Sequence, residues 1–539
     1  MIIRAPRITA SLLSTAMLVT GALAAASLAS TPAYAAGVAT ATPLRFALPT
    51  TDETTDVLAV GSDVWVAAGN SVLIATPTGT VKTSVNGLFG AKALTLSPDG
   101  QSVYVSASTG SKIFQVSTSG AILGSWASQG CPGKSAIAGG ALYYVYGCDA
   151  ATRGVARLDL STLTDASLLT DDNAQALTAA GSTLVTYTSG GQLTSYAIGA
   201  DGALTEQADE YTSTTYDAEL SPDGTQLLTT RYGGGYGLAR YDAATLAPFG
   251  TFDTGPYPSA VAWSPDGTKF AGIVDAMYET SPVHVFSAQD GTVLTRATSA
   301  GTTSYDSQAD EASWSADGRY LYSLAQEHAG NTYLVVTPAA GQAKAPLTVS
   351  VTPASAYGRN LKVTVRTANR PGTRVNVTVT QNGAAIKTSL TTNSSGVATV
   401  ALPAKASGTV TASTPTDLSY LAASTSARFS TPSVVTAKLT GQASTKKGVA
   451  QYTSYSKVRL NIQILPKHLG KVSISLQRRS GGTWKTVQKG TVATAANGTL
   501  PIVMTGAAKK VTFRFVVKAA ADSVAGASPT VISQSLVVN

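Results

Sequence analysis

The sequence predicts an all-β protein, and three observations lead to this prediction. A turn of the form Ser-Pro-Asp-Gly recurs between alternating apolar segments in the first part of the 539-residue chain. Units with this turn, or with a Gly-rich substitute, follow at a spacing of about 40 residues, the size of a four-stranded propeller blade. The rest consists of short Val- and Thr-rich alternating segments, a pattern typical of β-sandwiches. We therefore expect a seven-bladed β-propeller followed by two immunoglobulin-like sandwiches.

The first 35 residues have the layout of a signal peptide. Arg4 and Arg7 form a basic start, an uncharged apolar stretch over 11–27 follows, and Ala33-Tyr34-Ala35 provides a small-x-small cleavage site. The apolar stretch is short and rich in small residues, which favours a cleaved leader over a membrane anchor. We therefore expect a secreted, extracellular protein that can associate with the cell wall and has no transmembrane segment after cleavage.

Four units carry the turn in recognisable form. Pro presets one backbone angle, Asp accepts hydrogen bonds from nearby backbone, and Gly adopts positive φ. The turns span residues 97–100, 221–224, 264–267 and 315–318, the last with Ala in place of Pro. In three further units Gly-Ser or Gly-Gly replaces the turn. The seven predicted units start near residues 57, 93, 135, 176, 217, 261 and 312.

The last unit has room for only three strands, at 312–315, 320–324 and 333–337. The segment Leu44–Leu48 alternates in the same way and lies close to the mature N-terminus. As the outer strand of the last blade it would close the ring without a free edge. The predicted organisation is a signal peptide at 1–35, a propeller at 36–340, a linker at 341–346 and sandwiches at 347–431 and 432–539.

Two resemblances support this reading. The Ser-Pro-Asp-Gly turns resemble those of WD-repeat and lactonase-like bacterial β-propellers, which implies the fold. The Trp-Asp and Gly-His pairs of true WD repeats are missing, and no lactonase residues can be matched, so neither a partner site nor an activity is carried over. The string Leu476–Lys485 resembles the Ig-like repeats of secreted actinobacterial proteins. That resemblance implies a spacer or wall-adhesion module.

The formal net charge of +8 conceals a division of the chain. Residues 36–345 contain 13 Lys and Arg against 28 Asp and Glu, whereas residues 346–539 contain 23 against two. A strongly basic module is expected to adsorb to polyanions such as anionic cell-wall polymers. The alternative is that the charge only confers solubility, because lysines also protect strand edges. Stacking aromatics are sparse in the basic half, so we do not expect sequence-specific nucleic-acid binding.

Cys131 and Cys148 are the only cysteines. The first precedes the inner strand of the third unit and the second follows the next strand, so both fall on one face. In an exported protein this favours a disulfide over a redox pair. The Gly133-Lys134-Ser135 triplet looks like the end of a phosphate-binding loop, but the required earlier Gly is Ser128, and we reject that motif. The sequence predicts neither a cofactor nor a metal site.

The loops on one face of the predicted propeller collect acidic and aromatic residues. Tyrosine rings can stack on a ligand and carboxylates accept hydrogen bonds, so this face is a candidate binding site for a carbohydrate, a cationic ligand or a protein. The candidate residues are Tyr216, Asp217, Tyr232, Tyr236, Tyr257, Asp275, Tyr278, Glu279, Tyr305, Asp310, Glu311 and His328.

The leading hypothesis is a secreted, non-enzymatic protein whose propeller is a binding platform and whose basic modules act as spacer or wall anchor. One alternative is a propeller-type hydrolase or lactonase-like enzyme that uses the acidic loop face with His328 as general base. No Gly-x-Ser-x-Gly nucleophile motif accompanies that histidine. A second alternative is a structural adhesin, in which the sandwiches bind and the propeller is passive.

Overall fold

The computed structural model describes residues 38–50, 52–149, 152–170, 173–232, 235–275, 282–298, 305–306, 312–327 and 330–539. The predicted signal peptide lies outside these residues. The regular structure of the described part consists of strands and one short 3-10 helix, η1 (Tyr455–Lys457). No helix in those ranges is both long and apolar enough to cross a bilayer.

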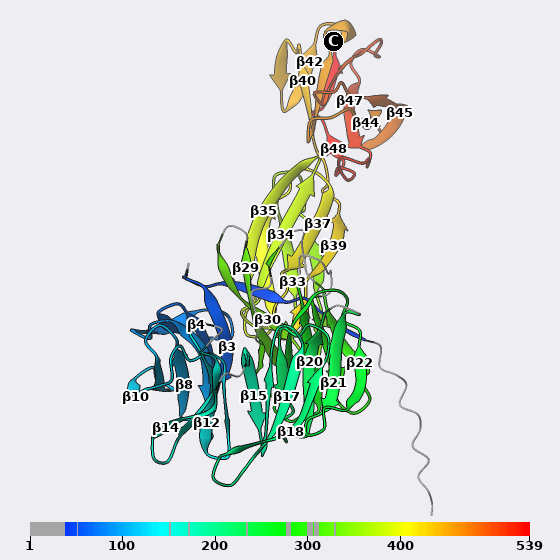
Figure 1. Ribbon diagram of the computed structural model, residues 1–539. Helices are drawn as coiled ribbons and strands as arrows, with labels where there is room; N and C mark the ends of the chain where they lie inside the picture. The colour runs from blue at the N-terminus through cyan, green and yellow to red at the C-terminus, as the bar shows by residue number, and fades with distance from the viewer. Residues whose placement is uncertain are drawn as a thin grey trace, which may run out of the picture. The chain divides into compact units, whose positions relative to one another are not determined.

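The sheets of the amino-terminal part follow one another along the chain, each built from consecutive antiparallel strands (Figure 1). The first is β3 (Thr54–Val60), β4 (Asp63–Ala68), β5 (Ser71–Ala75) and β6 (Val81–Asn86). The second is β7 (Ala91–Leu96), β8 (Ser102–Ala107), β9 (Lys112–Ser117) and β10 (Ile122–Ala127). The third is β11 (Ser135–Ala138), β12 (Ala141–Tyr146), β13 (Gly154–Asp159) and β14 (Asp165–Thr170).

Two more four-stranded sheets repeat this pattern. The fourth is β15 (Ala176–Ala180), β16 (Thr183–Tyr187), β17 (Gln192–Ile198) and β18 (Leu204–Tyr211). The fifth is β19 (Ala218–Leu220), β20 (Gln226–Arg231), β21 (Gly237–Asp242) and β22 (Pro248–Phe252). The fold is therefore all-β with repeated four-stranded sheets, as the sequence predicted.

The last two sheets each take a strand from the beginning of the described chain. The sixth contains β23 (Pro258–Trp263), β24 (Lys269–Val274), β25 (Val283–Ser287) and β26 (Val293–Ala297), with β1 (Ala39–Ala41) parallel to β26. The seventh contains β27 (Tyr305–Asp306), β28 (Ala312–Trp314), β29 (Tyr320–Glu327) and β30 (Thr332–Pro338), with β2 (Leu44–Ala47) antiparallel to β30. The predicted pairing of the 44–48 segment with the last unit is confirmed. The pairing of β1 was not predicted.

The first strands of the sheets lie next to one another. Strand β3 contacts β7, and β7, β11, β15, β19, β23 and β28 each contact the next in this order. Strand β28 of the seventh sheet in turn contacts β3 of the first. Apolar side chains fill the space between neighbouring sheets. Trp65 of the first sheet, for example, is fully buried against Leu94 and Val105 of the second.

The four Ser-x-Asp-Gly turns share one geometry that explains their recurrence. In the first, Gly100 has φ +67°, which a side chain would strain. Ser97 Oγ donates to Asp99 Oδ1 at 2.6 Å, and the Gln101 amide donates to the same oxygen at 3.0 Å. These hydrogen bonds lower the pKa of Asp99, since they favour the ionised carboxylate. The same Ser and backbone donors serve Asp223, Asp266 and Asp317.

Residues 347–431 form two facing sheets around one apolar core, which includes Leu361, Val377 and Val410. One sheet is β32 (Thr348–Thr352), β33 (Asn360–Arg366) and β36 (Val397–Pro403). The other is β35 (Ala384–Thr391), β34 (Arg374–Gln381), β37 (Gly408–Thr414) and β39 (Ala423–Phe429).

Residues 432–539 form a second two-sheet unit around Leu460, Phe515 and Val517. Its smaller sheet is β40 (Val434–Thr440), β43 (Arg459–Leu465) and β46 (Thr499–Val503). Its larger sheet is β41 (Ser444–Lys446), β42 (Val449–Tyr452), β49 (Leu536–Val538), β47 (Thr512–Ala519), β44 (Lys471–Ser480) and β45 (Thr483–Ala493), with β48 (Val531–Ile532) beside β47.

The segment predicted as a linker, 341–346, has structure of its own. It contains β31 (Ala343–Lys344), which pairs in parallel with β38 (Tyr420–Leu421). Gln342 accepts a hydrogen bond from the Thr42 amide through its side-chain oxygen at 2.7 Å. The segment is therefore a paired connection rather than the free spacer that its composition indicated.

The predicted disulfide is present. Cys131 and Cys148 are bonded to each other, with a sequence separation of 17 and 5.1 Å between their Cα atoms. The bridge ties the segment that enters β11 to the segment that leaves β12.

Replacing both cysteines by serine is expected to destabilise the first part of the chain by about 2–3 kcal/mol, because the unfolded chain regains the freedom of the closed loop. For a unit of this size that corresponds to a fall of roughly 4–10 °C in its melting midpoint, measured by calorimetry. A midpoint within 1 °C of the unmodified chain would contradict a stabilising role.

Candidate functional site

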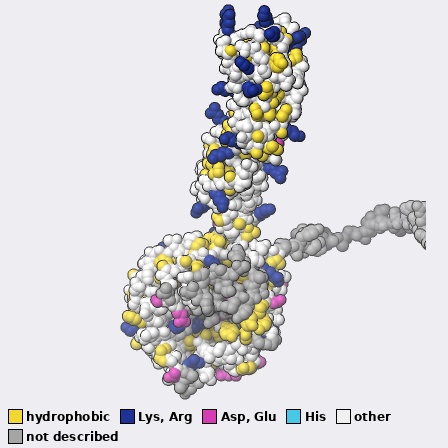
Figure 2. All heavy atoms as spheres, turned by 90° about the horizontal axis from the view of Figure 1, so that it is seen from above, with side chains coloured by type: hydrophobic (Ala, Val, Ile, Leu, Met, Phe, Trp, Pro, Cys, Tyr) yellow, Lys and Arg dark blue, Asp and Glu magenta, His cyan; other side chains and the backbone are white. Residues whose placement is uncertain are grey.

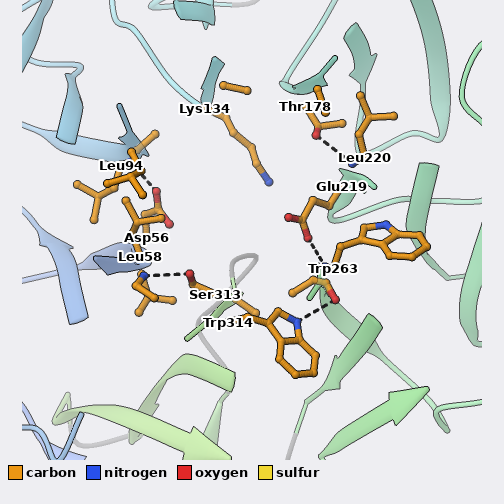
Figure 3. Close-up of a pocket in the computed structure, with 18 of the residues that line it drawn as sticks. Asp56, Leu58, Leu94, Lys134, Thr178, Glu219, Leu220, Trp263, Ser313 and Trp314 are labelled. Atoms are coloured by element: carbon orange, nitrogen blue, oxygen red, sulfur yellow. Dashed lines mark hydrogen bonds between the residues drawn. The ribbon is translucent and has the colours of Figure 1, made fainter. Parts of the chain in front are cut away.

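The first strands of all seven sheets surround a cavity of about 530 Å³ (Figure 3). Most of its wall is apolar backbone and small side chains. Polar groups converge in it from different sheets, and Figure 3 shows Asp56, Lys134 and Glu219 with their charged ends toward the open centre. The cavity is thus a place where the sheets bring together charged groups that are far apart in sequence.

A second cavity, of about 590 Å³, adjoins the first at Lys134 and Ala93, which line both. Its wall comes from segments that lead into the first strands. These residues include Glu53, Lys92, Gln175, Thr215 and Tyr216. The two cavities therefore meet at the Lys134 side chain, and the second one opens toward the loop face that the sequence singled out.

Lys134 and Asp217 form an ion pair at this junction. Lys134 Nζ lies 2.7 Å from Asp217 Oδ1 and donates to the Tyr187 hydroxyl at 2.9 Å. The Tyr187 hydroxyl donates to Asp217 Oδ1 at 3.2 Å, and the Val261 amide donates to Oδ2 at 2.9 Å. Asp217 is only 2% exposed, so this full set of donors offsets the loss of water around its charge.

Asp56 and Glu219 lie in the same cavity with a different environment. Asp56 Oδ2 accepts the Leu94 amide at 2.6 Å, and Glu219 Oε2 accepts the Trp263 amide at 2.7 Å. Neither makes an ion pair among the described residues. Desolvation raises the pKa of Asp56 to about 7 and that of Glu219 to about 8. Glu219 is therefore mostly protonated at neutral pH.

These carboxyl groups belong to a wider set of side chains that bridge neighbouring sheets. In each case the acceptor comes from one sheet and the backbone N–H from the first strand of the next. Ser313 Oγ accepts the Ala59 amide at 3.0 Å, from the seventh sheet to the first. Thr178 Oγ1 accepts the Leu220 amide at 3.1 Å, from the fourth sheet to the fifth. The charged groups of the cavity therefore also hold its wall together.

The segment that carries Lys134 is fixed on several sides. The Gly133 amide donates to the Val145 carbonyl at 2.8 Å, and the Gly147 amide donates to the Gly130 carbonyl at 2.8 Å. The disulfide lies immediately before it, and Cys131 adopts φ +52°. This bracing sets the position from which the lysine reaches Asp217, which lies 83 residues away in sequence.

Four of the predicted tyrosines form one aromatic cluster at the ends of the fifth and sixth sheets. Ring centroids are 5.6 Å apart for Tyr216–Tyr232, 5.5 Å for Tyr232–Tyr236, 5.5 Å for Tyr232–Tyr257 and 5.2 Å for Tyr236–Tyr257. A hydrogen bond with Tyr257 raises the pKa of Tyr236. Tyr216 is 44% and Tyr236 43% exposed, so the cluster presents ring surface to solvent. We call these four residues the tyrosine cluster.

The tyrosine cluster adjoins the second cavity, because Tyr216 belongs to both. The backbone holds the cluster in place: Tyr257 adopts φ +58°, and its carbonyl accepts the Asp275 amide at 3.1 Å. A polar cavity bordered by exposed aromatic rings is suited to a ligand that offers both hydroxyl groups and a flat face.

The other predicted site residues have different outcomes. Asp217 was expected on the loop face, but it is buried at the cavity junction, because its carboxylate is drawn inward by Lys134 and backbone amides. Only the backbone of Tyr305 is described, in β27. Outside the described residues lie Tyr278, Glu279, Asp310, Glu311 and His328.

Sequence reasoning missed three cavity residues: Asp56, Lys134 and Glu219. Each lies in or directly before a segment assigned to a buried strand. A charged residue at such a position is the signal that was available, since buried charges need partners. In the described part of the chain, no group of three or more His, Cys, Asp or Glu side chains is placed to hold a metal ion.

No family model matches the chain, and no curated protein matches it. Similar solved structures include the Kuenenia stuttgartiensis hydrazine synthase, 16% identical over 52% of this chain and 94% of that chain, with a TM-score of 0.43. A mitotic checkpoint complex is 15% identical over 60% and 99%, with a TM-score of 0.45. The Neurospora crassa Pan2 WD40 domain is 11% identical over 55% and 94%, with a TM-score of 0.41. At these identities the similarity concerns the fold alone.

Glu219→Gln is expected to make stability less dependent on pH. The folded pKa of about 8 lies above the ordinary 4.5, so the folded state binds the extra proton, and stability falls as pH rises from about 4.5 to about 8. The variant cannot ionise and keeps an acceptor for the Trp263 amide. Its melting midpoint relative to the unmodified chain should rise across this window, by the equivalent of roughly 2–4 kcal/mol.

The matched control is Glu206→Gln, at an exposed position on β18. It should shift the curve of midpoint against pH by less than 1 °C at every pH. A Glu219→Gln curve parallel to that of the unmodified chain would show that Glu219 is not protonated in the folded state.

Lys134→Met is expected to destabilise the protein by about 3–5 kcal/mol, because it leaves the Asp217 carboxylate buried without a cation. The double variant Lys134→Met/Asp217→Asn should recover most of this loss. Thermal unfolding of both variants tests the pair, and a Lys134→Met cost below 1 kcal/mol would count against it.

Proposed function

We propose that this chain is a secreted, non-enzymatic binding protein. In this proposal the seven amino-terminal sheets form a closed seven-bladed propeller, and residues 347–431 and 432–539 are Ig-like modules. The propeller binds an oligosaccharide at the second cavity and the tyrosine cluster. The basic modules space it from, or hold it on, an anionic cell-wall polymer.

Contacts between first strands support the closed propeller. They run through the sheets in order and return from β28 to β3, and β2 completes the seventh sheet from the other end of the chain. Chain ends that share the last sheet protect it from opening. The leader-like start of the sequence and the disulfide support secretion, since disulfides persist in oxidising compartments.

The tyrosine cluster beside the second cavity is the observation that carries the binding role. Exposed aromatic rings cost free energy in water unless a partner covers them, and here two rings are more than 40% exposed at the mouth of a cavity. Glu53, Lys92 and Gln175 supply hydrogen-bonding groups of both kinds around that cavity. Sugars match this combination, because their ring faces stack on aromatics while their hydroxyl groups donate and accept.

The enzymatic alternative depended on His328, which lies outside the described residues. The described cavity residues are engaged in structural contacts: Asp217 with Lys134, and Asp56 and Glu219 with backbone amides. This arrangement favours binding over catalysis as the working proposal.

The charge of residues 346–539 supports the anchoring role. On the face shown in Figure 2, Lys and Arg side chains stand over the surface of the sandwiches, while most of the visible Asp and Glu belong to the amino-terminal sheets. Adsorption of the full chain to purified Gram-positive cell walls at low salt, with release at high salt, is the expected behaviour.

Tyr236→Ala is expected to weaken oligosaccharide binding at least ten-fold without loss of fold, because it removes an exposed ring from the cluster. The probes are cellohexaose, maltohexaose and chitohexaose, and binding is followed by calorimetry. The control is Tyr211→Ala, which removes a ring that is 71% exposed on β18 and outside the cluster. Equal loss in both variants, or no binding of any of the three sugars, would overturn the carbohydrate proposal.

A further inference from the structure

The second sandwich contains positive charge that its own acids do not neutralise. Residues 346–539 contain only two acidic residues, Asp417 and Asp522. Asp417 pairs with Arg370, and Asp522 lies 2.8 Å from His468 Nε2. All of these residues are described, and neither acid reaches the strands β44, β45 and β47. The cations on those strands therefore have no acidic partner within the chain.

Strand register gathers five of these cations on one face. In the pairing of β47, β44 and β45, Lys518 lies beside Ser473, Arg514 beside Gln477, and Lys489 beside Ser475. Side chains alternate across a strand, so residues two apart share a face. The cations of this face, the cationic face below, are Lys471, Arg479, Lys489, Arg514 and Lys518.

Burial confirms which side is free. The opposite side of the same strands carries Val472, Phe513, Phe515 and Val517, all buried in the core of the sandwich. On the cationic face, Lys471, Arg479, Lys489 and Lys518 are exposed and Arg514 is half-buried. Strand β45 is the last strand of the sheet, and nearly all of its residues are exposed. The cationic face is therefore accessible to a large partner.

One aromatic residue shapes the face. The Arg514 guanidinium lies 4.2 Å from the ring centroid of Trp484, and its Nε donates to Gln477 Oε1 at 2.9 Å. These contacts fix the guanidinium over the indole. They also cover one face of the only tryptophan in the basic half, so that ring face is not available for stacking on a nucleobase.

The spacing of the cations favours a linear polyanion. Neighbouring strands are about 4.8 Å apart, and residues two apart on a strand are roughly 6.8 Å apart. The charges thus lie well within a Debye length of about 8–10 Å, so they repel one another across the sheet. A chain with one phosphate per short repeat would offset several of these repulsions at once. The face is only three strands wide, which suits a single flexible chain rather than a duplex.

We propose that the cationic face binds a flexible linear polymer that carries phosphate groups and no bases. This deepens the anchoring part of the proposed function, on which it rests. The polymer lies across β47, β44 and β45 and is held by charge and by the oriented Arg514, not by aromatic stacking. A membrane surface is disfavoured, because insertion needs exposed apolar side chains and Trp484 is engaged with Arg514.

The test uses the full chain with long-chain inorganic polyphosphate as the probe, at about 0.1 M salt. The variant is Arg479→Gln/Lys489→Gln/Lys518→Gln. The matched control is Lys438→Gln/Lys446→Gln/Lys457→Gln, which removes the same charge at exposed positions elsewhere in the sandwich. Melting midpoints within 2 °C of the unmodified chain show that both are folded.

We expect the face variant to weaken polyphosphate binding at least ten-fold and the control less than three-fold. The slope of log K against log salt should fall by about two in the face variant, as three phosphate contacts are lost. Equal weakening in both variants would overturn the cationic face while leaving a diffuse basic anchor. No binding by the unmodified chain would overturn the anchoring function itself.

Two further probes test the choice of ligand. Duplex DNA and vesicles with one third anionic lipid are compared with polyphosphate at equal phosphate concentration. Weaker binding of both supports the proposal. Tighter binding of either one, lost in the face variant, would assign the cationic face to that partner instead.

Discussion

The amino-terminal part depends on one constraint: the first strand of each sheet has an edge that no strand of its own sheet covers. The N–H groups on that edge are buried and need acceptors. The protein supplies them from side chains of the preceding sheet, as with Asp56 for Leu94, Thr178 for Leu220 and Ser313 for Ala59. These bonds join sheets that share no backbone pairing, and they place polar groups around the cavity.

The charged groups of the cavity follow from this constraint and bear on function. Asp217 links the fifth and sixth sheets, and its charge requires the cation that Lys134 brings from the third. The disulfide and the backbone bonds of the 130–134 segment hold that lysine in position. The junction closes one cavity from the other, so a ligand at the tyrosine cluster meets a rigid floor. Binding sites on rigid scaffolds lose less entropy when they are occupied.

The sequence allowed much of the fold to be predicted, because its turns act locally. Ser97, Asp99 and Gly100 set their turn geometry with hydrogen bonds and a φ angle that involve only close neighbours. Convergence of four tyrosines was also within reach, since loops at one end of successive sheets lie together. The Lys134–Asp217 pair was not, because it joins residues 83 apart and depends on how the sheets pack. Lys134 even stood in a motif that was examined and rejected for another role.

Hydrogen exchange in β23 tests the central claim most directly. The Val261 and Trp263 amides donate to Asp217 and Glu219 of the preceding sheet. In Glu219→Ala, exchange of the Trp263 amide should accelerate at least a hundred-fold, while amides of β24 in the same sheet stay protected. Unchanged protection of Trp263 would contradict the account, because it would mean that packing alone, without side-chain acceptors, closes the edges of the first strands.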